Sequence, residues 1–194
     1  MESQRPKVQI VEYKTSWPEE FTQIARVLKD GLGDLALRID HIGSTSVPGL
    51  PAKDIIDLQI TVSALNQELI QAMEKLGYRF SEGYTQDHIP PGYTDDPQPW
   101  QKFSFRPPYG QRRTHCHVRI LGNPNQRYPL LFRDYLRAHP ETAEAYARLK
   151  RMLAEHLADP GMYPDVKDPA VDLIYLPAEE WAQQTNWQPG PSDF

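Results

Sequence analysis

The sequence predicts a single domain of the α+β class over residues 1–194, in which helices flank a mixed β-sheet and further helices follow at the C-terminal end. Short segments that alternate apolar and polar residues all lie within the first 121 residues, and after Asn123-Pro124 the pattern becomes helical. The sequence shows no internal repeat, heptad pattern or clear linker. At 194 residues, the chain is long enough to bury one good hydrophobic core.

Turn residues and apolar periodicity divide the first half of the chain into elements. Ser16-Trp17-Pro18-Glu19 has the pattern of a capping box with proline at the first helical position, and it predicts a helix over residues 18–32. Alternation predicts strands over residues 8–13, 35–42 and 55–62. Ser63 is expected to begin a second helix over residues 64–76.

A long polar segment, residues 81–100, separates these elements from the second half. It contains four prolines and two glycines, and loops of this length are often functional lids or mobile segments. Residues 101–106 and 114–121 are typical of a β-hairpin. Helices are expected over residues 129–139 and 141–158, and residues 165–187 should be helical in parts with a break at Pro177. Residues 188–194 are expected to fray.

The composition excludes several classes of function. Lys and Arg number 21 and Asp and Glu number 26, so the formal net charge is −5, and the whole surface does not attract nucleic acid or anionic membranes. One cysteine allows no internal disulfide, and the first residues lack the apolar run of a signal peptide. We expect a cytoplasmic protein whose partner is a small molecule, with no membrane and no general nucleic-acid binding.

Strand parity collects polar residues on one face of the predicted sheet. Asp57, Gln59 and Thr61 alternate with apolar residues along one strand, and His115 and His117 alternate with apolar residues along another. If both strands join one sheet with their apolar faces aligned, the polar face combines a carboxylate, imidazoles and nearby cations. That combination suits a metal ion and an anionic substrate. The alternative is a solvated sheet face, which is common in antiparallel sheets.

Parity assigns a structural role to three other reactive residues. Cys116 shares the apolar side of its strand, which predicts an inert buried thiol. His41 shares the apolar side with Leu37 and Ile39, which predicts a hydrogen-bonded core histidine. Asp54 precedes the strand and is expected to be a loop residue.

The loop between the first two predicted sheet strands, HIGSTSVPGLPAK over residues 41–53, is rich in small residues. A turn of this kind after a strand can direct backbone N–H groups and hydroxyls at phosphate oxygens. It is not a Walker A loop, because Gly43 and Gly49 are separated by five residues and no Lys-Ser/Thr pair follows Gly49. A simple turn without a ligand is the alternative interpretation.

The longer segment HIGSTSVPGLPAKDIIDLQI resembles the signature of the GrpB-like family, which belongs to the nucleotidyltransferase superfamily. Further blocks agree in order over about residues 8–168, among them Gly77-Tyr78 and residues 115–118 and 132–137. GrpB-like domains also occur appended to dephospho-coenzyme A kinases, which suggests nucleotide or coenzyme chemistry by analogy.

The resemblance implies a nucleotidyltransferase-like fold and site. The superfamily places a Gly-Ser turn before a strand with two carboxylates, and a third carboxylate follows on a later strand; these acids bind two Mg²⁺ ions. By position, Gly43-Ser44 is the turn, Asp57 the first carboxylate and Gln59 the second. A carboxylate at position 59 would lie about 7 Å from Asp57 along the strand, so Gln59→Asp is expected to tighten Mg²⁺ binding.

The departures from this pattern leave the cofactor open: one Mg²⁺, a softer ion such as Mn²⁺ or Zn²⁺, or no catalysis. The resemblance implies catalytic roles for Asp57 and His117, and a metal site formed by Asp57, His115 and His117. Phosphate or substrate binding is expected of loop and helix residues, namely Gly43, Ser44, Thr45, Ser46, Lys53, Arg133, Tyr146, Lys150 and Lys167.

Three functions therefore follow from the sequence. The preferred one is metal-dependent nucleotidyl or phosphoryl transfer on a nucleotide or coenzyme-type substrate. The alternative is a non-catalytic nucleotide- or coenzyme-binding module that has lost part of the carboxylate metal site. A histidine-dependent phosphohydrolase is the third.

Overall fold

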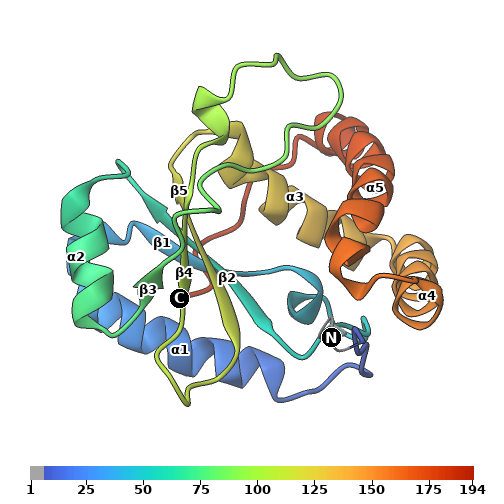
Figure 1. The fold of residues 1–194 in the computed structure, drawn as a ribbon. Helices are drawn as coiled ribbons and strands as arrows, with labels where there is room; N and C mark the ends of the chain where they lie inside the picture. Colours follow the sequence, from blue (N-terminus) through green and yellow to red (C-terminus); the bar gives the residue numbers. More distant parts are fainter. Residues whose placement is uncertain (1–6) are drawn as a thin grey trace.

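The computed structural model describes residues 7–194 and contains a five-stranded mixed β-sheet in the order β1-β2-β5-β4-β3 (Figure 1). The central strands β2 and β5 are parallel, and the other neighbours are antiparallel. The predicted α+β class is confirmed. The strands are β1 (Arg38–Ile42), β2 (Ile56–Val62), β3 (Arg79–Phe80), β4 (Phe103–Arg106) and β5 (Thr114–Ile120).

Register confirms the parity argument. Asp57 lies opposite His115 and Gln59 lies opposite His117 across the β2–β5 pair, so the four side chains share one sheet face. The predicted hairpin is β4 and β5, which are antiparallel. The short edge strand β3 was missed, because two residues carry no alternation that a sequence pattern can detect.

The apolar sheet face packs under α1 (Trp17–Leu32) and α2 (Gln67–Lys75), which lie side by side (Figure 1). This is the main core, and buried side chains of both helices meet those of β2 and β5 there. The expected caps differ in detail. Ser16 Oγ donates to Glu20 Oε1 instead of closing a capping box, and Asn66, not Ser63, caps α2 by accepting from the Leu69 N–H at 3.0 Å.

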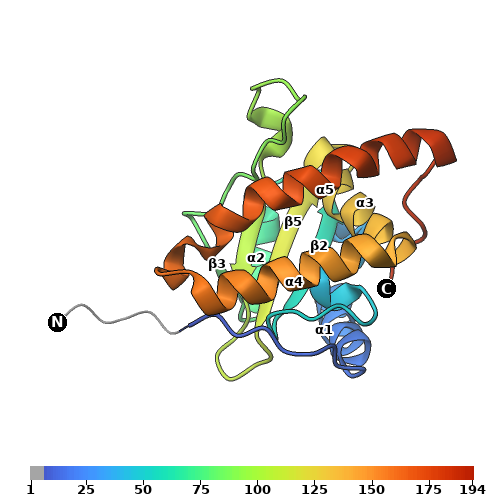
Figure 2. The same ribbon diagram turned by 90° about the vertical axis from the view of Figure 1, so that its right-hand side faces the viewer.

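Three helices form the other side of the molecule: α3 (Pro124–Ala138), α4 (Pro140–His156) and α5 (Tyr163–Thr185). Helices α4 and α5 lie side by side in front of the sheet, while the segment before β4 projects beyond them (Figure 2). Two smaller apolar clusters join these helices, one around Phe132 and Tyr146 and one around Leu131 and Tyr175.

Helix α5 continues through Pro169 and Pro177, so the break expected at Pro177 is wrong. A proline removes one hydrogen bond to the carbonyl four residues earlier. Here those carbonyls belong to Asp165 and Leu173, both exposed, so water can satisfy them. Buried Tyr175 anchors the helix to α3. Within residues 7–194, no helix combines the length and apolar character that a membrane crossing requires.

The C-terminal segment does not fray, which corrects the expectation for residues 188–194. Strand β1 is a sheet edge, so its outward backbone N–H groups need partners. Ser192 Oγ accepts from the Ile39 N–H, and Asp193 Oδ2 accepts from the His41 N–H, each at 2.9 Å. Near the N-terminus, an isolated bridge between Val11 and Ala52 takes the place of the strand expected over residues 8–13.

Candidate functional site

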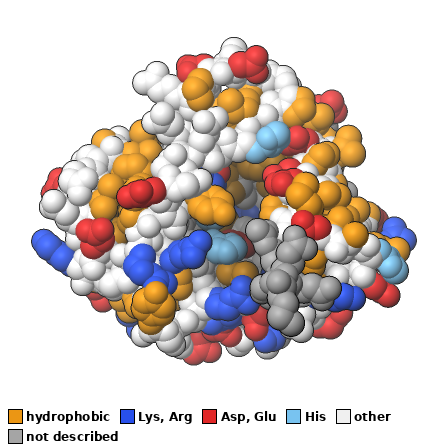
Figure 3. Space-filling model, viewed as in Figure 1, with side chains coloured by type: hydrophobic (Ala, Val, Ile, Leu, Met, Phe, Trp, Pro, Cys, Tyr) orange, Lys and Arg blue, Asp and Glu red, His pale blue; other side chains and the backbone are white. Residues whose placement is uncertain are grey.

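A cleft of about 760 Å³ lies between the polar sheet face and the C-terminal helices. Figure 3 shows this face of the molecule hollowed at that position. The turn after β1, the strands β2 and β5, and the helices α3, α4 and α5 all contribute to its walls. Several residues expected in the site line it, namely Gly43, Ser44, Lys53, Asp57, His115, His117, Tyr146, Lys150 and Lys167.

Asp57, His115 and His117 form a cluster in this cleft that can hold one metal ion. One ligand atom from each residue lies within 4.8 Å of the others. The parallel pairing of β2 and β5 sets this geometry, because it puts Asp57 opposite His115, and His117 follows on the same face. His115 Nδ1 donates to Asp57 Oδ1 at 2.8 Å, a contact that a shared metal ion would replace.

The protonation states of the cluster suit a metal ligand set. Burial alone would raise the pKa of Asp57, but the hydrogen bond from His115 and the nearby positive charges lower it, so this carboxyl is ionised. Burial and the charge of Arg119 hold the pKa of His117 well below its usual value, so its imidazole is neutral. His117 Nδ1 is buried and finds no hydrogen-bond partner within residues 7–194. Two imidazoles and one carboxylate favour Mn²⁺ or Zn²⁺ over Mg²⁺.

Gly43 brings the turn after β1 into close contact with this cluster. Its φ is +69°, and a Cβ at this position would lie 2.5 Å from Asp57 Oδ2. Any side chain here would therefore displace the carboxylate. The glycine of the predicted Gly-Ser turn has a physical function, which is to let the backbone approach Asp57.

Ser44 and three lysines, Lys53, Lys150 and Lys167, line the cleft beside the cluster. Lys150 Nζ donates to Ser44 Oγ at 2.9 Å and to the Pro51 carbonyl at 2.5 Å. Burial, together with the charges of Lys167 and Arg151, lowers the pKa of Lys150 to about 7. A bound anion would oppose both effects. Within residues 7–194, Lys53 and Lys150 form no ion pair, whereas Lys167 pairs with Asp168 at 3.3 Å.

Comparison with known proteins identifies the family. Residues 7–176 match the family described as GrpB protein. This chain belongs to the GrpB family. It is similar to the crystal structure of the conserved protein GrpB from Enterococcus faecalis, with 31 % sequence identity and a TM-score of 0.71 over 89 % of this chain and 99 % of that one.

Two further matches of this GrpB-family chain are to longer proteins. It is 37 % identical to a dephospho-CoA kinase from Mycolicibacterium paratuberculosis over 95 % of this chain and 49 % of that protein. The chain spans about half the length of the dephospho-CoA kinases that it matches. It is also similar to Cid1 in complex with its short product ApU, with 11 % identity and a TM-score of 0.48 over 74 % of this chain and 42 % of that one.

Gln59 does not face open cleft, which corrects the sequence-based placement. Its side chain is fully buried. Its Oε1 accepts from Arg119 at 2.8 Å, and its Nε2 donates to the Gln126 carbonyl at 3.0 Å. Both ends of the amide are therefore occupied by protein groups, and Gln59 cannot serve as a metal ligand in this arrangement.

The segment before β4 contributes a carboxylate that sequence reasoning missed. Asp87 accepts from Arg119 through both oxygens, at 2.8 and 2.9 Å, and from Lys102 at 2.7 Å and Asn125 at 3.1 Å. Arg119 shares strand parity with His117, so alternation already places it on this face. Asp87 lies in a loop without periodicity, and the sequence contains no signal for its position.

Three residues expected to bind phosphate have structural roles instead. Arg133 is buried and donates to the His41 carbonyl at 2.9 Å and to Asp193 at 2.6 Å, so it holds the C-terminal segment. Thr45 is buried against His41 Nε2 at 3.0 Å, and Ser46 Oγ donates to the Gly43 carbonyl at 2.6 Å. Their short side chains stabilise the turn itself.

The structural roles assigned to His41, Cys116 and Asp54 are confirmed. His41 is buried and stacks on Phe21, with ring centroids 4.8 Å apart. Cys116 is buried, and burial raises the pKa of its thiol. Asp54 precedes β2 and accepts from Lys14 at 2.7 Å.

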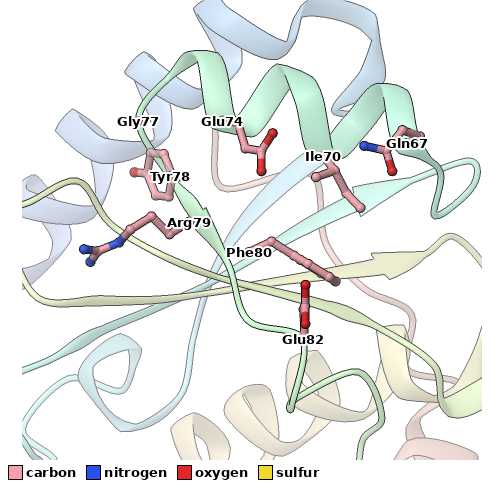
Figure 4. A pocket seen from close by; sticks show the side chains of 8 residues that line it. All are labelled: Gln67, Ile70, Glu74, Gly77, Tyr78, Arg79, Phe80 and Glu82. Atoms are coloured by element: carbon pink, nitrogen blue, oxygen red, sulfur yellow. The ribbon is translucent and has the colours of Figure 1, made fainter.

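A separate depression lies between α2 and β3 (Figure 4). It shares no lining residue with the cleft, and its charged residues are Glu74, Glu82 and Arg79. The Arg79 guanidinium already lies over the Tyr109 ring at 3.8 Å and donates to the Pro107 carbonyl. Two carboxylates beside one engaged cation do not favour a phosphate ligand. The cleft is therefore the candidate site.

Proposed function

We propose that this cleft catalyses metal-dependent nucleotidyl or phosphoryl transfer on a nucleotide or coenzyme-type substrate. The observation that supports it best is the contact between two sites of complementary chemistry. The Asp57–His115–His117 cluster, the metal-type cluster of this cleft, directly adjoins the turn that carries Ser44. The two are in contact because Gly43 packs against the Asp57 carboxylate. Phosphoryl-transfer sites need a cation directly beside donors that bind the phosphate oxygens.

In this proposal three residues bind the metal ion and two bind the phosphate group. Asp57, His115 and His117 would hold one divalent ion, of which Mn²⁺ or Zn²⁺ suits the donors better than Mg²⁺. The ion, when bound, withdraws charge from a phosphoryl oxygen. Ser44 donates its hydroxyl to a phosphate oxygen, and Lys150 neutralises charge on the same group.

Lys53 and Lys167 extend the positive region along the cleft. Both line it, and burial lowers the pKa of Lys53, with the charge of Lys167 acting in the same direction. Mutual repulsion among these ammonium groups is relieved when a polyanionic substrate enters. The site therefore favours a ligand with several phosphate charges, such as a nucleoside triphosphate or a coenzyme with a diphosphate.

A non-catalytic binding module is the second candidate, and the burial of Gln59 favours it. The position at which the superfamily resemblance expects a second carboxylate carries an amide already bonded to Arg119. A module of this kind would retain the Ser44–Lys150 region and bind phosphates without turnover. The similarity to proteins named dephospho-CoA kinase makes dephospho-CoA a reasonable ligand to test for either function.

The deciding experiment combines thermal shift with release of labelled phosphate or pyrophosphate from ATP, with and without dephospho-CoA, in Mg²⁺, Mn²⁺ or Zn²⁺. A transferase should show turnover that disappears in chelator and in Asp57→Asn. Asp30→Asn, an exposed carboxylate on α1, is the matched control and should keep full activity. If ATP stabilises wild type and Asp57→Asn equally in chelator, and no metal gives turnover, the binding module is correct.

A further inference from the structure

The polar sheet face continues past the Asp57–His115–His117 cluster into a buried, charged network. This network consists of Gln59, Asp87, Lys102, Arg119 and Asn125. Gln59 lies two residues after Asp57 on β2, and Arg119 lies two residues after His117 on β5. Their side chains therefore share the face of the cluster. Gln59 is 0 % exposed and Arg119 is 6 % exposed. This network lies where a second metal ion of the same face would have to bind.

The oxygens of Gln59 and Asp87 already have protein donors, whereas Asn125 Oδ1 has none within residues 7–194. The Gln59 oxygen accepts from Arg119, and both oxygens of Asp87 accept from the same guanidinium. Lys102 and Asn125 donate to Asp87 as well. A divalent ion here would have to displace Arg119 from a bidentate, charge-assisted pair, which is the strongest type of protein hydrogen bond.

The charge of the network also opposes a second cation. Asp87 contributes −1, and Lys102 and Arg119 contribute +1 each, so the sum over these three groups is +1. The side chains are largely buried, and Coulomb repulsion is stronger there than in water.

We infer that Arg119 is a built-in cation that takes the place of a second divalent ion, so that the cleft binds one divalent ion per chain. Asp87 is the positioning residue, because it fixes the guanidinium from the loop side while Gln59 fixes it from the sheet side. This inference rests on the metal site of the proposed function. It also reverses the sequence-based expectation for Gln59→Asp: the new carboxylate pairs with Arg119 and does not recruit Mg²⁺.

The test is the stoichiometry of Mn²⁺ binding, measured by calorimetry and electron paramagnetic resonance without substrate. Wild type should bind one ion per chain, and Asp57→Asn should bind none. Gln59→Asp should still bind one ion with affinity within about threefold of wild type. The double variant Gln59→Asp/Arg119→Gln frees the new carboxylate and should bind a second ion, whereas Arg119→Gln alone should bind one.

Two ions in wild type, or a second ion in Gln59→Asp alone, would overturn the inference. A folded double variant with one ion would overturn it too. Should the double variant not fold, the single variant Gln59→Asp decides: one ion supports the inference and two contradict it. No bound ion in wild type removes both this inference and the metal site, whereas one ion without turnover leaves the inference intact and rejects only the transferase.

Discussion

Lys150 Nζ donates a hydrogen bond to Ser44 Oγ over 2.9 Å and so joins helix α4 to the turn that follows β1. Lys150 is 3 % exposed, and its amine lies 4.6 Å from the centre of the Tyr146 ring. Ser44 also belongs to the turn that contacts the Asp57 carboxylate. The Ser44–Lys150 pair therefore joins α4 to the proposed phosphate-binding turn, next to the proposed metal ligand Asp57.

Binding of a polyphosphate should be coupled to proton uptake by Lys150. Burial lowers the pKa of Lys150 to about 7, so at pH 8 the amine is mostly neutral without ligand. An anion beside it raises the pKa, and up to about one proton is taken up per ligand bound. Calorimetry of ATP binding at pH 8 with chelator, in buffers of different ionisation enthalpy, measures this number.

Lys150→Met should bind ATP at least about tenfold more weakly and lose the proton uptake, because it removes both a hydrogen bond to charge and the titrating group. Arg148→Met, an exposed cation on the same helix, is the matched control and should behave like wild type. Tight ATP binding by wild type at pH 8 without proton uptake would contradict the assigned pKa of Lys150.

Gly43→Ala should lower both the stability of the fold and the affinity for Mn²⁺. Gly43 has φ +69°, and the added Cβ would lie 2.5 Å from Asp57 Oδ2. We expect a loss of about 1–3 kcal/mol in the free energy of unfolding from the strained backbone. Displacement of the carboxylate should also weaken Mn²⁺ binding by about tenfold or more.

Gly49→Ala is the control for this substitution, because Gly49 belongs to the same loop and has φ +77°. Within the described part of the chain, a Cβ at position 49 meets no heavy atom within 4 Å. It should lose stability without losing Mn²⁺ affinity, as measured by urea unfolding and calorimetry. Equal Mn²⁺ affinity in the two variants would show that the Gly43–Asp57 contact does not shape the metal site.

His41 should make the fold less stable in mild acid. Burial lowers the pKa of His41 from 6.5 to about 4 in the folded protein. Below pH 6.5 the unfolded chain takes up a proton that the folded chain does not accept until about pH 4. The stability present above pH 6.5 is therefore lost progressively as the pH falls through this window, by up to about 3 kcal/mol.

Urea unfolding between pH 4.5 and 7 tests this linkage. His41→Gln keeps a polar group beside Thr45 but removes the titration, so its unfolding free energy should change less steeply with pH than that of wild type. His156→Gln removes a histidine whose side chain is 60 % exposed and should keep the wild-type slope. Parallel slopes for wild type and His41→Gln would reject the assignment.

The sequence by itself determined the local order of the site. Alternation along a strand is a property of the backbone, so Asp57 had to share a face with Gln59, and His115 with His117, whatever the sheet order. The same rule placed His41 and Cys116 in the core. The Gly-Ser turn and the β4–β5 hairpin are likewise short-range features, because neighbouring residues encode them.

The tertiary structure alone decided which of these groups are free to act. Gln59 is closed off by the Gln126 carbonyl, 67 residues away in sequence, and Asp87 reaches Arg119 from 32 residues away. Arg133 is bound to the His41 carbonyl, 92 residues away, and to Asp193. Alternation along a strand predicts on which face of the sheet a side chain lies. Its partner depends on how distant segments pack, because hydrogen bonds and ion pairs are satisfied by proximity in space, whatever the separation along the chain.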